Sequence, residues 1–304
     1  MNYTLHQLRI FVEVVRQESV TRAAEELHMT QPALSIQLKN FQGQFDIPLT
    51  EVVGRKLFIT EFGRSIGQQA GNVLREAETI QYKTKEYGDL LTGRLSVSSA
   101  STGKYVVPYF LSGFLKQHKG IDLILDVTNK SRVLQSLHHN EIDFALVSVV
   151  PEGLKVDEES LLPNHLYMVG NTPQLDEDRP YIFREEGSAT RLAMDHYLGQ
   201  QQGRKRMELT SNEAVKQALL AGLGYSIIPL IGIHNELSSG ELHIIPAPSL
   251  PITTTWRLIW LRDKKLSPVA KAYLEYVRHS KQQIINENFK WYQDYQRKQK
   301  VKAR

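Results

Sequence analysis

The sequence predicts a chain of α + α/β class with three parts: an N-terminal winged helix-turn-helix, a long helix, and a C-terminal two-lobed α/β domain. Apolar residues recur at helical spacing in three short runs before residue 46, and again along a proline-free stretch that starts at Phe62. After "LTGR" at residues 91–94, strand-like patterns such as "RLSVSSA" and "IDLILDV" alternate with helical runs, which is typical of an α/β domain.

Composition narrows the class of protein. The chain has 304 residues, enough for about two domains, with 41% hydrophobic and 23% charged residues, as in ordinary globular proteins. The absence of cysteine excludes disulfides, thiol catalysis and cysteine-ligated zinc. No export signal is visible, and the longest uncharged run is interrupted by glycines and a proline and is shorter than the ~20 residues of a membrane span. We therefore expect a cytoplasmic protein without a membrane partner.

The positive charge is concentrated at the C-terminal end. The sequence pI is about 9.0, but residues 278–304 alone carry eight basic and two acidic side chains, whereas residues 1–60 carry six of each. Bulk charge is thus no argument for DNA binding. We expect residues 281–304 to form a solvated basic tail; alternatively, its apolar residues extend the last helix against the protein, or its basic end adds nonspecific affinity for DNA.

Three helices are expected in the first 45 residues. Ser19 and Thr30 stand where N-caps would open the second and third helices, and Pro32 is tolerated in a first turn. Only "LHMT" separates these helices, and a tight turn between crossing helices is the helix-turn-helix arrangement. The expected core residues are Leu5, Leu8, Val12, Val15, Val20, Ala23, Ala24, Leu27, Leu34, Leu38, Phe41 and Phe45.

The outward face of the third helix has the chemistry to read base edges. Gln can pair with adenine, Ser can serve any base, Pro and Ile carbons can meet a thymine methyl, and Lys can reach guanine or phosphate. A solvated polar face is the alternative. The following "LTEVVGRKLFIT" predicts a hairpin, or wing, with basic residues at its tip. The predicted DNA-binding residues are Thr30, Gln31, Pro32, Ser35, Lys39, Arg55 and Lys56.

"SVTRAAEELHMTQPALSIQLKNFQGQFDIPL" and "GRKLFITEFG" carry a resemblance to the winged helix-turn-helix of LysR-type transcriptional regulators. It covers about the first 65 residues. Phe45 and Asp46 replace the usual Leu-Gly, and Thr50 replaces the usual Phe. Val52 stands where many members have Arg, which leaves Arg55 as the candidate for the contact with phosphate or the minor groove.

The stretch after Phe62 predicts one long helix whose apolar stripe would be exposed to solvent unless another element packs on it. An intramolecular partner is one explanation. The resemblance implies a dimerising linker helix, which would present two recognition helices to DNA of dyad symmetry, and a homo-oligomer assembled as a dimer of dimers. The stripe consists of Ile66, Ala70, Val73, Ala77, Ile80, Tyr87 and Leu91.

The remaining chain predicts two α/β lobes with a ligand between them, near strand ends and helix starts. That "TWRLIWLR" and the final helix return to the first lobe, as in periplasmic-binding-protein-like domains, is implied by the resemblance. The expected domains are 1–60 (DNA-binding), 61–92 (linker helix), 93–280 (effector-binding) and 281–304 (tail). Within the effector domain, lobe I is 93–164 plus 263–280, and lobe II is 165–262.

Two segments have the chemistry of an anion site. "SSASTGKY" and "FREEGSATR" each run into a helix, with hydroxyls and backbone N–H groups at the junction. Helix capping alone is the alternative for each segment, but two of them in facing lobes favour a negatively charged ligand. The expected effector-binding residues are Ser99, Ser101, Thr102, Ser148, Gly187, Ser188, Thr190, Arg191 and Ser211.

A second resemblance covers this domain. "FREEGSATR" and "SNEAVKQALLAGLGYSIIP" resemble the branch of the LysR family that responds to metabolites of carbon fixation or sulfur assimilation, which implies a small anionic metabolite as effector. Ala189 stands where Gly is common in that branch. No cofactor is expected, and no metal, because the adjacent His138 and His139 cannot share a helix face at the i, i+4 spacing that metal binding requires.

Three functions are compatible with these patterns. The first is a LysR-type regulator whose DNA binding depends on a small anion. The second is a solute-binding module without specific affinity for DNA. The third is an enzyme that acts on an anionic metabolite, which would need a general base or nucleophile in the cleft. The sequence offers hydroxyls and an Arg there but no evident base, so we expect a regulator and no enzymatic activity.

Overall fold

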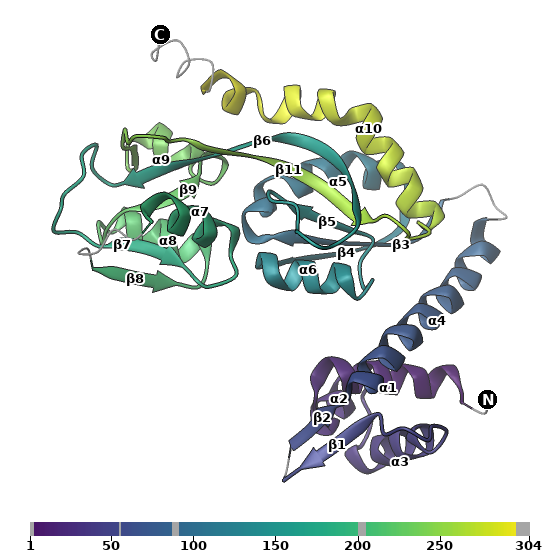
Figure 1. Cartoon of the computed structure of the whole chain (residues 1–304). Helices are drawn as coiled ribbons and strands as arrows, with labels where there is room; N and C mark the ends of the chain where they lie inside the picture. The colour runs from purple at the N-terminus through teal and green to yellow at the C-terminus, as the bar shows by residue number, and fades with distance from the viewer. Residues whose placement is uncertain (1–2, 55, 87–90, 200–204, 296–304) are drawn as a thin grey trace. The chain divides into compact units, whose positions relative to one another are not determined.

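The computed structural model describes residues 3–54, 56–86, 91–199 and 205–295 (Figure 1). The chain divides into two compact units, Met1–Leu90 and Leu91–Arg304. Among the described residues, no helix combines the length and apolar character that a membrane crossing would require.

The first unit is a winged helix-turn-helix followed by a long helix. Its elements are α1 (Leu5–Gln17), α2 (Val20–Glu26), α3 (Gln31–Gln42), β1 (Thr50–Val53), β2 (Lys56–Ile59) and α4 (Glu61–Glu86). The hydroxyl of Ser19 accepts a hydrogen bond from the Arg22 N–H, and that of Thr30 accepts one from Ala33. Both expected N-caps are therefore confirmed. Strands β1 and β2 pair antiparallel to form the wing.

Phe45 is not in the third helix as expected. Helix α3 ends at Gln42 with Gly43 as its C-cap, so Phe45 lies in the connection that follows. It still packs with Tyr3, Phe41 and Phe62, with ring centroids 5.1 to 6.2 Å apart. The apolar character of position 45 thus predicted its partial burial but not its secondary structure.

The long helix also ends earlier than its apolar pattern suggested. Helix α4 is described to Glu86, and Tyr87 lies outside the described residues. Leu91 packs against the core of the second unit instead of continuing the stripe. The stripe of α4 therefore does not reach Leu91.

The second unit is built on a mixed sheet. Among the described residues, the sheet has seven strands: six follow the order β10-β6-β11-β5-β3-β4, and the seventh, β9, pairs with β6. A second, two-stranded parallel sheet joins β7 to β8. The strands are β3 (Thr92–Ala100), β4 (Gly120–Thr128), β5 (Phe144–Val147), β6 (Val156–Gly170), β7 (Tyr181–Arg184), β8 (Arg206–Leu209), β9 (Ser226–Pro229), β10 (His243–Ile244) and β11 (Ile252–Leu261).

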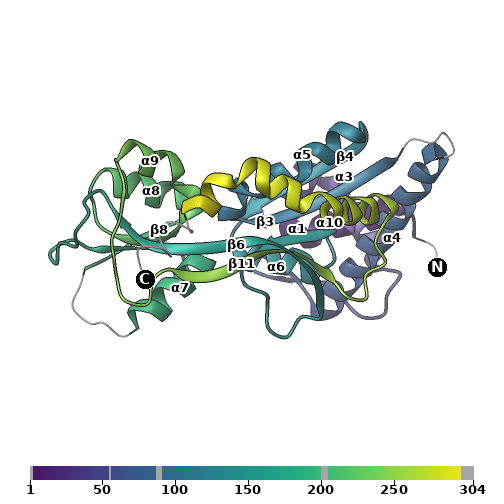
Figure 2. The ribbon, with the colours of Figure 1, turned by 90° about the horizontal axis from the view of Figure 1, so that it is seen from above.

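Helices surround these strands in two lobes. The first lobe holds β3, β4 and β5 with the 3-10 helix η1 and helices α5 and α6, and the second holds β7, β8 and β9 with η2, α7, α8 and α9 (Figures 1 and 2). The helices are η1 (Ser101–Tyr105), α5 (Val107–Gln117), α6 (Lys130–His138), α7 (Ala189–Leu198), α8 (Asn212–Leu220), η2 (Leu230–Gly232), α9 (His234–Ser239) and α10 (Pro268–Asn288).

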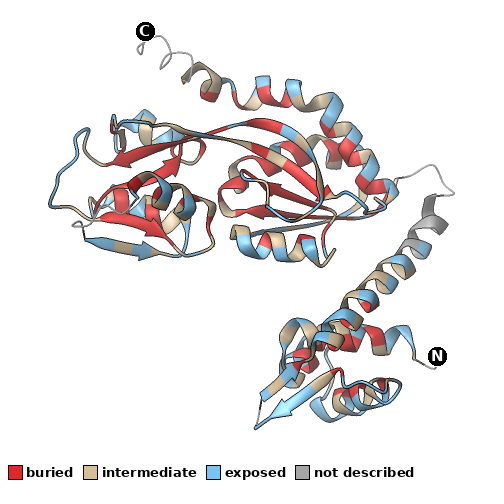
Figure 3. Ribbon diagram, in the orientation of Figure 1, coloured by how far each residue is buried: buried red, intermediate tan, exposed pale blue. Residues whose placement is uncertain are grey.

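Strands β6 and β11 belong to both lobes. They pair antiparallel from Ile252 opposite Leu166 to Leu261 opposite Val156, and Figure 2 shows them running the length of both lobes. The expected lobe boundary at 164/165 therefore falls inside one continuous strand. The chain cannot be divided into separate lobes at this position because both lobes share one buried cluster. This cluster includes residues of β3 and α5 together with residues of β7 and α8 (Figure 3).

The C-terminal segment is packed as far as it is described, which corrects the expected solvated tail beginning at residue 281. Helix α10 continues to Asn288, and residues 290–295 are again helical. Phe289 packs on Tyr109 and Phe110 of α5. Tyr292 accepts a hydrogen bond from the backbone N–H of His165 at 2.9 Å. The apolar residues that extend the last helix therefore decide its structure, and residues 296–304 lie outside the described part.

This segment bridges the two lobes. Phe289 contacts the first lobe through α5, whereas the ring of Trp291 lies 3.9 Å from the ring of His234 at the start of α9 in the second. Before this segment, two ion pairs join α10 to β6: Arg278 and Lys281 both contact the carboxylate of Glu159. Burial alone would raise the pKa of Glu159. The two cations donate hydrogen bonds to its carboxylate and carry the opposite charge, and together these effects hold the pKa below its ordinary value.

Phe289→Ala tests the packing of the C-terminal segment. Phe289 is only 2% exposed, so its truncation should lower the free energy of unfolding by about 3–5 kcal/mol. The neighbouring Lys290 is exposed, and Lys290→Ala should change the stability by less than about 0.5 kcal/mol. Denaturant unfolding of both variants measures this, and equal midpoints would contradict the packing described.

Candidate functional site

The DNA-reading face predicted from the sequence is exposed on α3 and the wing. Gln31, Pro32 and Lys39 are exposed, while Leu34 and Leu38 on the opposite face are buried in the unit's core. The Gln31 amide donates a hydrogen bond to the Ser35 hydroxyl at 3.3 Å. Side chains that could contact DNA therefore share one solvent-facing surface.

The wing presents more apolar surface than expected. Lys56 is exposed, and Arg55 lies outside the described residues. Val52 and Val53, which form one of the two apolar runs expected for the hairpin, are 69% and 63% exposed. Two adjacent valines in a four-residue strand must point to opposite faces, so at least one had to be exposed on a two-stranded sheet.

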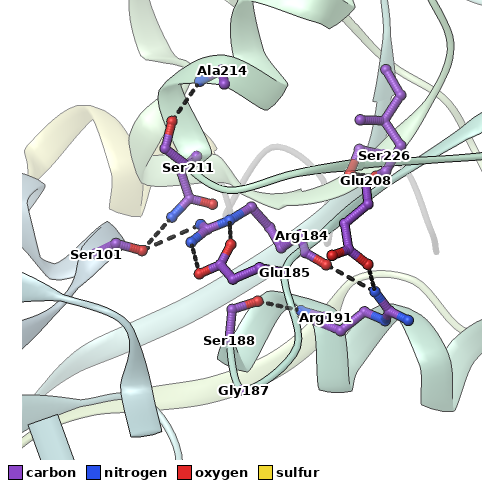
Figure 4. A network of polar contacts seen from close by, with 12 residues as sticks. Ser101, Arg184, Glu185, Gly187, Ser188, Arg191, Glu208, Ser211, Ala214 and Ser226 are labelled. Atoms are coloured by element: carbon purple, nitrogen blue, oxygen red, sulfur yellow. Dashed lines mark hydrogen bonds and ion pairs between the residues drawn. The ribbon is translucent and has the colours of Figure 1, made fainter. Parts of the chain in front are cut away.

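In the second unit, the strand ends of the two lobes meet at Ser101. This residue follows the last residue of β3 and begins η1. Its hydroxyl oxygen accepts hydrogen bonds from Nη1 of Arg184 at 3.2 Å and from the side-chain amide of Asn212 at 2.8 Å (Figure 4). Both donors belong to the second lobe, so Ser101 links the lobes directly.

Arg184 is the cation of this contact, and the sequence analysis missed it. It is the last residue of β7 and only 2% exposed. Its Nε and Nη2 each contact one carboxylate oxygen of Glu185 at 2.7 Å, which forms a bidentate ion pair between chain neighbours. The pattern that could have indicated Arg184 is the buried strand "YIFR". An Arg at the carboxyl end of such a strand lies at the edge of the sheet where ligands bind in α/β folds.

Arg191, the predicted anion ligand, lies outside this contact. Its guanidinium pairs with Asp195 at 2.7 Å and Glu208 at 2.8 Å, and it donates to the backbone carbonyl of Arg184 at 3.0 Å. Figure 4 shows it with Glu208, away from Ser101. Two carboxylates already balance its single charge, one of them at the i+4 position of the same helix.

A second link between the lobes involves Gly187. The hydroxyl of Ser131, in α6 of the first lobe, donates to the Gly187 carbonyl at 3.2 Å. Gly187 has φ of +82°, and a Cβ there would lie 2.5 Å from the Ser131 oxygen. Ser188 then caps α7, since its hydroxyl accepts from the N–H of Arg191. Ser131 is a second residue that the sequence analysis missed.

The other predicted effector residues divide between helix caps and buried positions near strand ends. Ser211 caps α8 and is exposed. Ser99 is fully buried and donates to the carbonyl of Ala100. Thr102, Ser148 and Thr190 are buried, and within the described ranges none of them hydrogen-bonds to Ser101 or Arg184. The residues that the structure brings together are Ser101, Ser131, Arg184, Glu185, Gly187 and Asn212, here called the cross-lobe cluster.

The cross-lobe cluster has unused hydrogen-bonding capacity. Ser101 accepts two bonds, but its own proton is donated to no acceptor among the described residues. The side-chain oxygen of Asn212 is buried and lacks a hydrogen-bond partner there. The cluster can therefore offer a guanidinium, a hydroxyl donor and an amide acceptor to a small molecule with acidic and donor groups. In the part of the chain that the structure describes, no group of His, Asp or Glu side chains could hold a metal ion.

Comparison with known families accounts for both units. Residues 5–64 match the bacterial regulatory helix-turn-helix protein family of lysR type, and residues 88–282 match the LysR substrate binding domain. The chain belongs to the LysR family. A LysR member of this architecture is a DNA-binding transcriptional regulator with an effector domain, which agrees with the first of the three functions expected from the sequence.

Relatives of this LysR protein match it over nearly its whole length. The "RuBisCO operon transcriptional regulator" of Allochromatium vinosum is 36% identical over 91% of the chain and 96% of its own length. The "HTH-type transcriptional activator CmpR" of Synechocystis is 33% identical over 91% and 95%. The chain is therefore similar to LysR regulators of carbon fixation, which agrees with the branch that the sequence resembles.

A solved structure resembles the LysR effector unit. It is the regulatory domain of Synechocystis CcmR in complex with 2-PG, which is 31% identical and superimposes with a TM-score of 0.56. The match covers 61% of this chain and 96% of that one.

Gly187→Ala tests the second link between the lobes. The φ of +82° strains any L side chain, and the added Cβ must also displace the Ser131 hydroxyl. Gly153→Ala is the matched control, because Gly153 has φ of +79° with open space around its Cβ position. Both should lose about 1 kcal/mol of stability to backbone strain, and Gly187→Ala should lose more in thermal unfolding. The additional loss should shrink in a Ser131→Gly background, and a loss independent of Ser131 would refute the contact.

Proposed function

We propose that this LysR regulator binds a small anionic metabolite at the cross-lobe cluster, and that the bound anion alters how its two-fold assembly contacts DNA. The observation that carries the proposal is the contact of Arg184, a nearly fully buried arginine of the second lobe, with Ser101 of the first. A buried guanidinium with a free hydroxyl donor beside it is chemistry suited to phosphate or carboxylate. The 2-PG complex of the related CcmR domain supports an anion of this class.

The proposed ligand residues differ from those expected at first. Arg184 replaces Arg191 as the cation, and Ser131 and Asn212 join Ser101 and Gly187. Thr102 and Ser188 lie next to these residues in the chain and remain in the proposal as flanking positions of the cleft. In the part of the chain that the structure describes, no contact supports a direct role for Ser99, Ser148, Thr190 or Ser211.

The coupling mechanism follows from the two-lobed design. Ser101 and Ser131 bond to the second lobe, so a ligand that bridges Arg184 and Ser101 stabilises one arrangement of the lobes over others. An effector shifts this equilibrium only by its difference in affinity for the two arrangements. We propose that the selected arrangement changes the spacing or angle of the DNA-binding heads.

The DNA-binding side of the proposal rests on α3 and α4. The exposed face of α3 would read base edges in the major groove, with Gln31 and Ser35 as direct contacts and Lys39 as a phosphate or guanine contact. Val73 on the stripe of α4 is 47% exposed, which supports pairing of two copies through this helix and a dimer of dimers on DNA of dyad symmetry. The names of the relatives support genes of carbon fixation as targets.

Arg184→Ala and Arg191→Ala distinguish the proposed site from the one expected at first. A ligand at 100 times its Kd should stabilise the unit that it binds by about 2.7 kcal/mol. The thermal shift caused by 2-PG should therefore disappear in Arg184→Ala and persist in Arg191→Ala, because Arg191 is paired elsewhere. The reverse pattern would return the anion site to Arg191, and the absence of a shift with 2-PG, inorganic phosphate and sulfate in the unmodified protein would refute an anionic effector.

Gln31→Ala tests the base-reading face. Loss of a bidentate contact should weaken binding to a specific site by about 1–3 kcal/mol and relax the preference at one base pair. Affinity for random DNA should remain nearly unchanged. Binding curves on both DNAs at the same salt concentration measure this, and an equal loss on random DNA would identify Gln31 as a phosphate contact or a structural residue.

A further inference from the structure

The bidentate face of Arg184 is occupied by the chain itself. Nε and Nη2 form two parallel bonds of 2.7 Å with the carboxylate of Glu185, and only Nη1 is directed to Ser101 (Figure 4). This two-bond geometry is the one in which a guanidinium binds the carboxylate or phosphate of a ligand. An external anion can therefore obtain the strongest contact with Arg184 only by taking the place of Glu185.

Glu185 is placed so that it can leave. It is the residue after β7 and 17% exposed in its side chain, whereas Arg184 is 2% exposed. Among the described residues, its carboxylate pairs with no cation other than Arg184. Rotation of one side chain into water would therefore release the guanidinium while the strand that holds Arg184 stays in place.

Glu185 also fills the site incompletely. The proton of Ser101 and the side-chain oxygen of Asn212 have no partner among the described residues. A carboxylate held by Arg184 Nε and Nη2 cannot supply the donor that the Asn212 oxygen needs, whereas a small acid with a hydroxyl or a protonated phosphate oxygen can. The cluster thus has the capacity to distinguish an added ligand from the carboxylate already present.

We propose that Glu185 is an internal competitor for the effector and sets its specificity; this inference rests on the proposed function. A monocarboxylate exchanges one carboxylate for another at Arg184 and gains little from the exchange. A phosphate carries a charge of about −1.5 to −2 and three acceptor oxygens, so it displaces Glu185 with a net gain. A ligand must therefore bind Arg184 more strongly than Glu185 does, and this requirement favours phosphate-bearing anions over monocarboxylates.

Titration calorimetry of the full chain with 2-PG tests this inference, with inorganic phosphate and acetate as competitors of 2-PG. Glu185→Gln removes the competing charge and keeps the shape of the side chain, so 2-PG should bind about tenfold more tightly. The affinity for acetate should rise at least as much as the affinity for 2-PG, so the preference for phosphate-bearing ligands over monocarboxylates should decrease. Glu186→Gln is the matched control, since it removes the same charge from the exposed next residue, and its affinity should stay within about twofold of that of the unmodified protein.

The outcomes separate this inference from the proposed function. Weaker or unchanged binding of 2-PG to Glu185→Gln, with normal binding to the unmodified protein, would overturn the competitor role and leave the anion site intact. A gain of equal size in Glu186→Gln would reduce the effect to overall charge and also overturn it. If neither the unmodified protein nor Glu185→Gln binds 2-PG or phosphate, both proposals fall. Glu185→Ala, which lacks any group that could hold Arg184, should reproduce the gain.

Discussion

The pairing of β6 with β11 is the constraint on which the effector unit depends. These strands run antiparallel through both lobes, and every other strand of the main sheet joins one of them directly or through β5. The two lobes therefore share these strands and one buried cluster. The segment around Phe289, Trp291 and Tyr292 adds a second connection across the same lobes. We propose that a ligand at the cross-lobe cluster changes the angle between the lobes within the limits that these connections set.

The burial of Arg184 explains the arrangement of its neighbours. Removing a guanidinium from water is costly unless the charge is paired and its donors are satisfied. Glu185 supplies the opposite charge, and Ser101 supplies an acceptor for the remaining nitrogen. The same requirement would make an anionic ligand a suitable replacement for Glu185, so the proposed recognition of a ligand and the contacts of Arg184 within the chain depend on the same nitrogen atoms.

Local signals in the sequence predicted the first unit well. Ser19 and Thr30 cap their helices as expected because an N-cap depends on a hydroxyl and on the residues within one turn of it. Phe45 was assigned to a helix because its spacing fitted, but Gly43 ends that helix first. The apolar residues after Lys281 indicated a packed helix, and the basic charge of the same segment suggested a solvated tail. Burial of Phe289 and Tyr292 decided the structure of that segment as far as it is described.

The anion site could be predicted only in part. The sequence pointed to the segments that contain Ser101 and Arg184, "SSASTGKY" and "FREEGSATR", because strand-to-helix junctions with hydroxyls can be recognised from the sequence alone. The expected cation was Arg191, whereas the proposed site uses Arg184, which lies in the same short segment. That choice depends on Asp195 and Glu208, which neutralise Arg191, and on Ser101 and Asn212, which are far from Arg184 in the chain.

We propose that an anion held by Arg184 changes the contact of this regulator with DNA. The most direct measurement is a footprint on DNA that the protein selects from a random library, recorded with and without 2-PG for the unmodified protein and for Arg184→Ala. The account predicts that 2-PG moves the boundary or the internal pattern of the footprint for the unmodified protein and leaves that of Arg184→Ala unchanged. Identical footprints with and without 2-PG, or the same change in both proteins, would contradict it.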